Sequence, residues 1–424
     1  MNVLKQILDP AARADPYRFF GALRESPVTL QDDGSYLVST YREIVALLHD
    51  PRISSDRRNL DSAAPHDPDL DPSFIGLDPP EHDRLRHLAM RHFGPPHSPG
   101  TVERLRPKML GLTTSLIDAL AGRNRADLVD EVAYPLPVAV ICALLGVPEE
   151  DEPRFHALAD EVVETLGPGE EDRAERERAR RAASMELSRY LAGLAEARGR
   201  EPRDDMLSGL MTYRGPEGGM TQDEVVATSV LLLIAGHETT INLIANGMLT
   251  FLRRPELLEL LREDPDLIIP AVEELLRYEP PVQFVSSRVA LDDITIADTT
   301  IPAGAPVVLA MAAGSRDPGH VARPDEFDLD RPRNEHLGFG GGVHYCFGAP
   351  LARTEAQIVL NELVRRLDNP RLVADPPPYR PSAVLRGPRH LVVEYDGVAP
   401  PDRRNRCART VGPRSCHTTY GVIR

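Results

Sequence analysis

The chain contains few cysteines, and their positions exclude the roles on which cysteine-rich proteins depend. Only four occur in 424 residues, at positions 142, 346, 407 and 416. Their spacings match no zinc or iron–sulfur pattern, and four cysteines are too few to staple a chain of this size with disulfides. Because free thiols persist in a reducing compartment, we expect a cytoplasmic protein.

Long apolar runs and a targeting leader are also lacking. No stretch of about 18 or more apolar residues occurs, so no membrane-spanning helix is expected. Residues 1–10 have neither the basic start nor the apolar centre of a secretory signal. The formal net charge is −16, and only Lys5 and Lys108 are lysines. A chain this acidic is not expected to bind nucleic acid, which usually requires a basic patch or stripe.

Size and composition predict one large folded domain followed by a tail. With 42% hydrophobic residues, the chain can bury a large core, and no linker-like segment or internal repeat divides residues 1–398. Residues 399–424 carry six arginines against one acid and show no apolar periodicity. We therefore expect a single domain at 1–398 and a basic, disordered tail at 399–424.

Periodicity predicts a mainly helical protein with a small β-rich lobe. A capping box at 221–224 opens a helix that meets no proline until Pro255, and its apolar first half predicts burial. The segment 52–80 lacks periodicity and is expected to be a long loop. Shorter helices are expected at 41–49, 79–93, 101–121, 126–146, 150–166 and 172–198, and strands at 35–40 and within 281–312.

One loop carries the strongest chemical signal. Residues 339–348 read Phe-Gly-Gly-Gly-Val-His-Tyr-Cys-Phe-Gly, and a helical run follows. Three glycines let the backbone turn tightly or approach something large and flat. Backbone N–H groups near the sulfur of such a loop lower the thiol's pKa and tune a bound metal. Taken alone, Cys346 fits equally well a buried, inert thiol in a glycine-rich turn.

A second signal interrupts the long apolar helix. Residues 235–240 read Ala-Gly-His-Glu-Thr-Thr. An acid inside a buried helix is unfavourable unless it is paired or used, and glycine weakens a helix by up to about 1 kcal/mol. The pattern predicts a local distortion that presents polar side chains, Glu238 and Thr239, to an internal cavity. The alternative is a structural Glu238 that a neighbouring arginine or histidine satisfies.

The loop at 339–348 resembles the haem-binding loop of the cytochrome P-450 monooxygenases at every position of that family's pattern. The resemblance extends over residues 10–397 and implies the P-450 fold, a triangular prism of helices around haem b. It implies that Cys346 is the axial ligand of the haem iron. The loop residues implied to surround the haem with it are Phe339, Gly340, His344 and Gly348.

The segment at 235–240 resembles the oxygen-binding groove of the same family. This implies that Ala235 lies against the haem, that the Thr239 hydroxyl orients oxygen, and that Glu238 relays protons. His82 and Arg86 share one helix face, which by itself is typical of an ordinary surface pair. In the family, residues at these positions bind the haem propionates, and the resemblance adds Arg288 and His344 to that role.

A third element resembles a structural part of the family. Glu274 and Arg277 match its Glu-x-x-Arg pattern, and Arg331 is the candidate third member. The resemblance implies that these three residues form scaffolding behind the haem and take no part in catalysis.

The resemblance implies a monooxygenase that inserts one atom of O₂ into a small organic substrate and reduces the other to water. Because the chain has no flavin or nicotinamide domain, we expect electrons from a separate ferredoxin and ferredoxin reductase, with Arg91 and Arg353 as candidate docking residues. A monomer is expected. Two alternatives stay open: a peroxide-driven or radical-coupling haem enzyme on the same scaffold, and a non-catalytic haem sensor.

The expected substrate is apolar or amphipathic, because the residues expected to contact it are mostly apolar. A product of secondary metabolism such as a macrolide, terpenoid or steroid would be hydroxylated or epoxidised. The expected contact residues are the 60–77 loop, Leu232, Ala235, 282–285, Val384 and Leu385.

Overall fold

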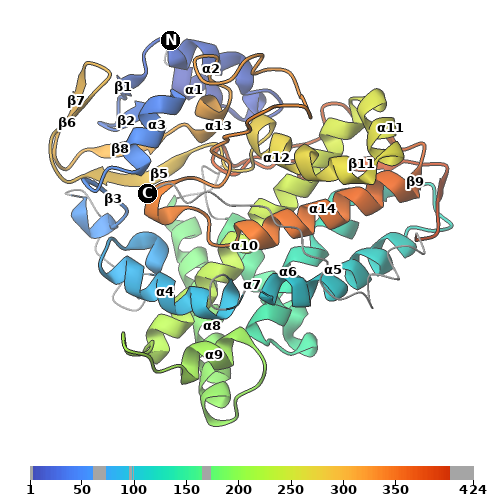
Figure 1. The fold of residues 1–424 in the computed structure, drawn as a ribbon, viewed down its shortest axis with the longest axis horizontal. Helices are drawn as coiled ribbons and strands as arrows, with labels where there is room; N and C mark the ends of the chain where they lie inside the picture. Colours follow the sequence, from blue (N-terminus) through green and yellow to red (C-terminus); the bar gives the residue numbers. More distant parts are fainter. Residues whose placement is uncertain (1–2, 61–72, 95–97, 99, 165–172, 402–424) are drawn as a thin grey trace.

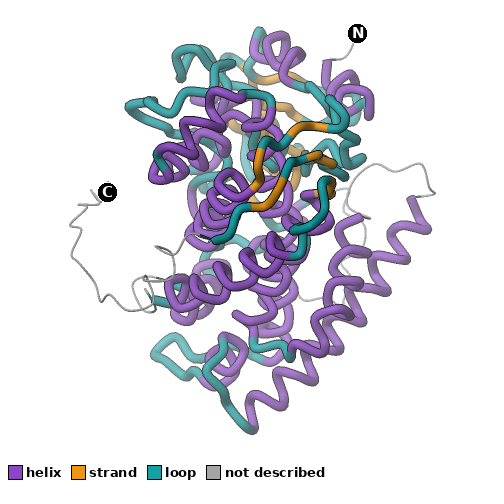
Figure 2. The backbone as a smooth tube through the Cα atoms, turned by 90° about the vertical axis from the view of Figure 1, so that its right-hand side faces the viewer, coloured by secondary structure: helices purple, strands orange, loops and turns teal. Residues whose placement is uncertain are grey.

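The computed structural model describes residues 3–60, 73–94, 98, 100–164 and 173–401 (Figure 1). Nearly all of the tail expected at 399–424, and most of the loop expected at 60–77, lie outside these residues. The described part is mainly helical with a small β-rich lobe, which confirms the predicted fold class. Figure 2 shows the strands gathered in one part of the molecule, with long helices crossing beside and below them.

Fourteen α-helices form about half of the described structure. They are α1 Val3–Leu8, α2 Tyr17–Arg24, α3 Tyr41–Leu48, α4 Glu81–Phe93, α5 Thr101–Asp118, α6 Pro135–Leu145, α7 Glu152–Glu164, α8 Arg173–Arg200, α9 Met206–Thr212, α10 Gln222–Leu252, α11 Pro255–Glu263, α12 Ile268–Tyr278, α13 Met311–Ser315 and α14 Ala349–Arg366.

The largest sheet has five strands in the order β1-β2-β8-β5-β3, of which only β2 and β8 pair in parallel. These strands are β1 Val28–Leu30, β2 Tyr36–Val38, β3 Ile53–Ser54, β5 Val285–Ala290 and β8 Pro306–Leu309. The smaller sheets are β10-β11-β4 (Arg371–Leu372, Val392–Glu394, Arg125–Asp127), β12-β9 (Gly397–Val398, Leu367–Asp368) and β6-β7 (Ile294–Ile296, Thr299–Ile301).

Helix α10 is the central helix of the fold, and its start is as predicted. The Thr221 side chain accepts a hydrogen bond from the Glu224 backbone, and the Glu224 carboxylate accepts one from the Thr221 backbone. The helix packs against α6, α8 and α14. It is the one helix in the described ranges that is long and apolar enough to span a membrane, and half of its most apolar window is buried inside the fold.

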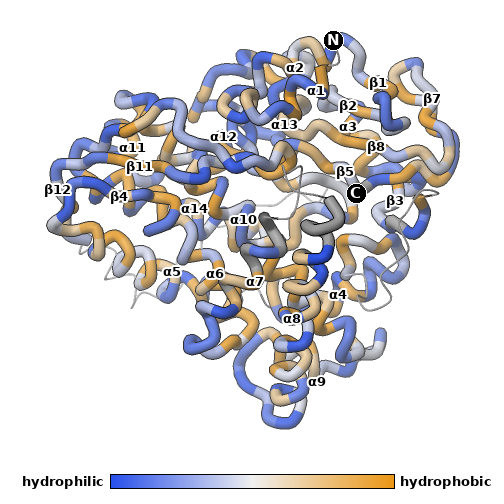
Figure 3. Tube along the Cα trace, turned by 180° about the vertical axis from the view of Figure 1, so that it is seen from behind, coloured by the Kyte–Doolittle hydropathy of each residue, from blue (hydrophilic) through white to orange (hydrophobic). Residues whose placement is uncertain are grey.

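Apolar residues form one large core among the helices and two smaller ones at the five-stranded sheet. One of the smaller cores joins Val307 and Leu309 of β8 to Ile44 of α3. The other joins Leu37 of β2 to Phe20 of α2. Along the tube in Figure 3, hydrophobic and hydrophilic residues alternate, as expected for helices that pack one face on a core.

The prediction of a helix at 126–146 was wrong for the start of this range. Residues 125–127 form β4, whose partner is β11 at 392–394. A π-helical turn at Val129–Ala133 follows, and α6 begins only at Pro135. Because the strand partner lies in a distant part of the chain, local periodicity cannot reveal it.

Candidate functional site

A cavity of about 550 Å³ lies between α10 and the loop at 339–348. Its lining includes the middle of α10, the start of α14, the turn at 74–76 and the segment 281–286, and most of the lining is apolar. The predicted site residues that line it are Arg86, Ala235, Thr239, Arg288, Phe339, Gly340, His344, Cys346 and Gly348. His82 and Glu238 lie outside the lining.

Glycine is required in the 339–348 loop at positions where the backbone is left-handed and crowded. Gly340 and Gly342 have φ angles of 69° and 63°, which side chains disfavour. A Cβ on Gly342 would lie 1.9 Å from the carbonyl oxygen of Leu48, at the end of α3. The loop is closed by the Cys346 N–H, which donates to the Phe339 carbonyl at 2.9 Å. The glycines therefore let the loop pack directly on α3 and aim Cys346 into the cavity.

Opposing influences act on the Cys346 thiol. Burial, the largest influence, raises its pKa above the ordinary value. The backbone N–H groups of Gly348 and Ala349, at the start of α14, and the cations Arg86 and Arg353 act to lower the pKa. These donors and cations stabilise a thiolate once a metal takes the place of the proton.

Four basic side chains gather at one edge of the cavity. The rings of His82 and His344 pack edge to face, with their centroids 4.5 Å apart. The Arg86 side chain donates to the Tyr345 carbonyl, and Arg288 is buried nearby. Burial, followed by the charges of Arg288, His82 and Arg86, lowers the pKa of His344 to about 3. Such a cluster is suited to hold an anionic group.

The His82 side chain has a ring nitrogen that is available to bind such an anionic group. The side chain is almost fully buried, and its Nδ1 pairs with Asp83 at 2.8 Å. Its Nε2 has no hydrogen-bond partner among the described residues. A buried polar atom without a partner is unfavourable unless a ligand satisfies it. An apolar slot with a cysteine on one wall and basic donors at one edge fits haem b, whose propionates would face those donors.

The predicted distortion of α10 is wrong, because the helix runs unbroken through residues 235–240. The Thr239 hydroxyl donates to the Ala235 carbonyl at 2.7 Å, an ordinary bond to the preceding turn. Gly236 serves packing, since a Cβ there would lie 3.1 Å from Ile141 of α6. Thr239 and Thr240 both line the cavity.

Glu238 does not face the cavity. It is buried, its Oε1 accepts from Asn242 at 3.0 Å, and Arg380 Nε forms an ion pair with it at 3.0 Å. This is the arrangement weighed above as the alternative, a Glu238 paired with an arginine. Its role as a proton relay therefore stays a prediction that requires the side chain to turn.

Most predicted substrate contacts lie in the cavity wall. Leu232, Ala235, Val282, Val285 and Val384 line it, whereas Leu385 instead forms a β-bridge with Val282. Residues 61–72 lie outside the described residues. Sequence reasoning missed several lining residues, because their elements reach the cavity only through packing: Leu48, Phe93, Ile141, Leu144, Leu276 and Met311.

Glu355 of α14 is a further missed residue of the lining. It is 2% exposed, and its Oε2 has no hydrogen-bond partner in the described structure. Burial raises its pKa to about 8. Its neighbours Thr354 and Ala356 are buried as well, which only the packing of α14 reveals.

The predicted scaffold comes together as expected. The Glu274 carboxylate accepts hydrogen bonds from Nε and Nη2 of Arg277, each at 2.8 Å. It also pairs with Arg331 Nε at 2.9 Å, and all three side chains are buried. The candidate docking arginines are ion-paired: Arg353 with Glu273 at 2.6 Å and Arg91 with Glu217 at 2.9 Å.

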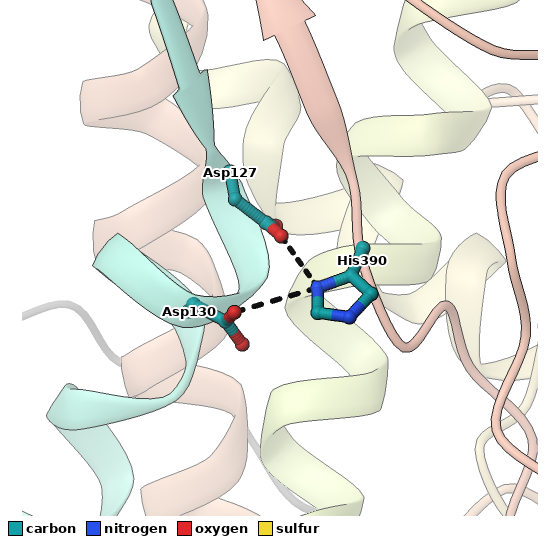
Figure 4. Close-up of side chains that lie close together, drawn as sticks. All are labelled: Asp127, Asp130 and His390. Carbon is teal, nitrogen blue, oxygen red and sulfur yellow. Dashed lines mark hydrogen bonds and ion pairs between the residues drawn. The ribbon is translucent and has the colours of Figure 1, made fainter.

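A separate group of potential metal ligands, Asp127, Asp130 and His390, lies at the junction of β4 and β11 (Figure 4). His390 Nδ1 pairs with Asp127 at 2.7 Å and with Asp130 at 3.4 Å, and Arg389 pairs with Asp130 at 3.1 Å. The other Asp127 oxygen accepts backbone N–H groups from Val129 and Leu391. These contacts show that the three side chains link the end of β4 to the segment before β11 through hydrogen bonds and ion pairs.

Comparison with known proteins places the chain in a family. The pattern of the family Cytochrome P450 matches residues 144–394. The chain is 38% identical to cytochrome P450 monooxygenase PikC of Streptomyces venezuelae, over 90% of this chain and 91% of that protein. It is 37% identical to vitamin D(3) 25-hydroxylase of Pseudonocardia autotrophica, over 95% of each. The solved structure of ligand-free Mycobacterium smegmatis CYP164A2 covers 92% of this chain and 99% of its own, at 41% identity and a TM-score of 0.83. The chain therefore belongs to the cytochrome P450 family and is a haem b-containing monooxygenase of the soluble bacterial type.

Proposed function

We propose that the protein hydroxylates or epoxidises a neutral, largely apolar product of secondary metabolism, with electrons from a separate ferredoxin and ferredoxin reductase. The observation that carries this proposal is the cavity, where Cys346 and the hydroxyl of Thr239 meet an apolar wall. Haem, when bound, supplies the activation of O₂. The protein supplies the ligand, the proton path and the position of the substrate.

The proposed haem contacts divide between the two sides of the cavity. Cys346 would be the iron ligand, and the loop residues Phe339, Gly340 and Gly348 would pack beside the bound haem. Ala235, which is exposed on the opposite wall, would contact it from α10. The basic cluster of His82, Arg86, Arg288 and His344 would hold the propionates.

The proposed proton path uses Thr239 and Glu238. A hydroxyl donates and accepts at once, so Thr239 can hold a proton donor close to the site of oxygen activation. Its own hydrogen is directed to Ala235, which leaves its oxygen available to accept. Glu238 adjoins Thr239 in sequence and reaches the cavity after its side chain rotates away from Arg380.

The proposed substrate class follows from the wall above the loop. α6, α10, the segment 281–286 and Val384 contribute mainly aliphatic or aromatic side chains, with Thr239, Thr240 and Ser286 as the polar groups among them. The ionisable residues of the lining belong to the basic cluster, to Cys346 and to Glu355. Because an unpaired charge is unfavourable against an apolar wall, a neutral substrate fits best. The relative named as a vitamin D(3) hydroxylase supports an apolar polycyclic substrate.

We propose further that the protein acts as a cytoplasmic monomer whose catalytic unit is residues 1–398. Strand β12, which ends at Val398, is the last element of the described fold. The relatives from bacteria support the compartment.

Three measurements test the proposal. The reduced protein with carbon monoxide should show a strongly red-shifted Soret band, and Cys346→Ser should lose it. Neutral macrolactones, steroids and terpenoids should change the haem spin state, whereas matched carboxylic acids should bind more weakly. Turnover should require NADPH, ferredoxin and reductase. Equal or faster turnover with peroxide alone would favour the peroxide-driven alternative, and binding without any product would favour the sensor.

A further inference from the structure

The hairpin at 378–389 joins the cavity wall to helix α10. Its two arms are bonded through Arg380 N–H to the Gly387 carbonyl at 3.1 Å. Its tip carries Val384, which lines the cavity. The Val384 carbonyl accepts from the Gln283 N–H at 2.8 Å. The tip is therefore bonded to the adjoining part of the wall, at 281–285, and a displaced wall displaces the hairpin.

Helix α10 meets this hairpin along polar residues spaced four apart, which share one helix face. Asn246 donates to the Arg386 carbonyl at 3.0 Å. A Cβ on Gly387 would lie 2.1 Å from the Asn242 side chain, so the hairpin backbone packs directly on the helix. Glu238 is the next residue of this face toward the start of the helix, and Asn242 donates to it.

Arg380 provides the ionic contact between the hairpin and Glu238. Arg380 Nε lies 3.0 Å from Glu238 Oε1, with side chains only 10% and 4% exposed. Nevertheless, neither Nε nor Nη2 of Arg380 has a hydrogen-bond partner among the described residues. The attraction is therefore one of charge without the alignment of a hydrogen bond. It holds the carboxylate near the arginine by charge, beside the hydrogen bond that Asn242 donates to the same Oε1.

We propose that Arg380 is a positioning residue that holds the Glu238 carboxylate outside the cavity and couples its orientation to the substrate wall at Val384. The inference rests on the relay role of Glu238 proposed above. A substrate that displaces Val384 moves the hairpin, weakens the contact between Arg380 and Glu238, and lets Glu238 turn toward Thr239. Proton delivery is then favoured when the cavity is filled.

The infrared stretch of carbon monoxide bound to the reduced holoenzyme tests where Glu238 points, without a substrate. A negative charge that approaches the bound molecule raises its stretching frequency. Arg380→Gln should therefore raise the frequency or add a second, higher band, and Arg380→Lys should restore the original band. Arg389→Gln is the matched control, because Arg389 lies on the same hairpin but pairs with Asp130; it should leave the band unchanged.

Hydrogen exchange tests the coupling to the wall. Because coupling is reciprocal, loss of the Glu238 charge must loosen the hairpin. Glu238→Gln and Arg380→Gln should each speed amide exchange in 378–389 by about tenfold, and the double variant should be no faster than either alone. If Arg380→Gln does not fold, Glu238→Gln must still speed exchange there.

Two results would overturn the inference: an unchanged carbon monoxide band in a folded Arg380→Gln, or additive effects on exchange in the double variant. Either would leave the proposed monooxygenase function standing. A failure of that function would appear separately, as a red-shifted carbon monoxide spectrum with no product under any electron supply.

Discussion

The imidazole rings of His82 and His344 stand 4.5 Å apart at 63°, one on α4 and the other two residues before Cys346. One ring is anchored on Asp83 and the other on Ser55, at 2.8 Å in each case. The two histidines thus join helix α4 to the cysteine loop at the edge where the haem propionates are proposed to lie.

Removal of a cation from this edge should weaken haem binding. Arg288→Leu removes a charged donor to a propionate, and such a bond contributes roughly 1.5–3 kcal/mol. We expect a haem dissociation constant raised by about tenfold to a hundredfold. The haem dissociation constant can be measured from the transfer of haem to an acceptor protein. Arg91→Leu, which removes an arginine paired with Glu217 on the surface, should leave haem affinity unchanged.

Alanine should not be tolerated at Gly342. Its left-handed backbone and the approach of the Leu48 carbonyl leave no space for a Cβ. Gly342→Ala should destabilise the fold by about 2–4 kcal/mol, as judged by urea unfolding. Gly348→Ala is the control, because its φ angle is −82° and no atom lies within 4 Å of an added Cβ. Equal stability of the two variants would contradict the geometry described for the loop.

The buried group of Glu274, Arg277 and Arg331 should be sensitive to the loss of one partner. Glu274→Gln leaves two buried guanidinium groups without a counter-charge, which costs about 3–5 kcal/mol. Arg323→Gln breaks the ion pairs of Arg323 with Glu326 and Asp328, in which the arginine side chain is 61% exposed. That change should cost less than about 1 kcal/mol in the same urea titration.

The raised pKa of Glu355 should make the stability of the fold depend on pH. Its pKa is raised to about 8 in the folded protein from 4.5, so the folded state binds more protons than the unfolded state between these values. Stability should therefore decrease as the pH rises from 4.5 to 8. Glu355→Gln cannot ionise and should remove this decrease, gaining on the order of 5 kcal/mol at pH 9 relative to the parent. Parallel pH profiles of unfolding for the two proteins would refute the assignment.

Much of the site could be predicted because its residues are neighbours along the chain. The glycine run forms one turn with Cys346, and the capping box at 221–224 opens α10 as expected. The strand at 125–127 could not be predicted, because its partner at 392–394 comes from the other end of the domain. The lining residue Glu355 was likewise missed, because only packing brings α14 to the cavity.

The sequence by itself determined the local features: where α10 begins, where a thiol follows three glycines, and which residues can offer charge or a hydroxyl. Each depends on spacing within a few residues, which backbone geometry converts directly into position. The tertiary structure decided that Glu238 meets Arg380 outside the cavity and that α10 stays unbroken at Gly236. A buried charge takes whichever partner the fold brings to it, and that choice depends on the packing of segments far apart in the chain.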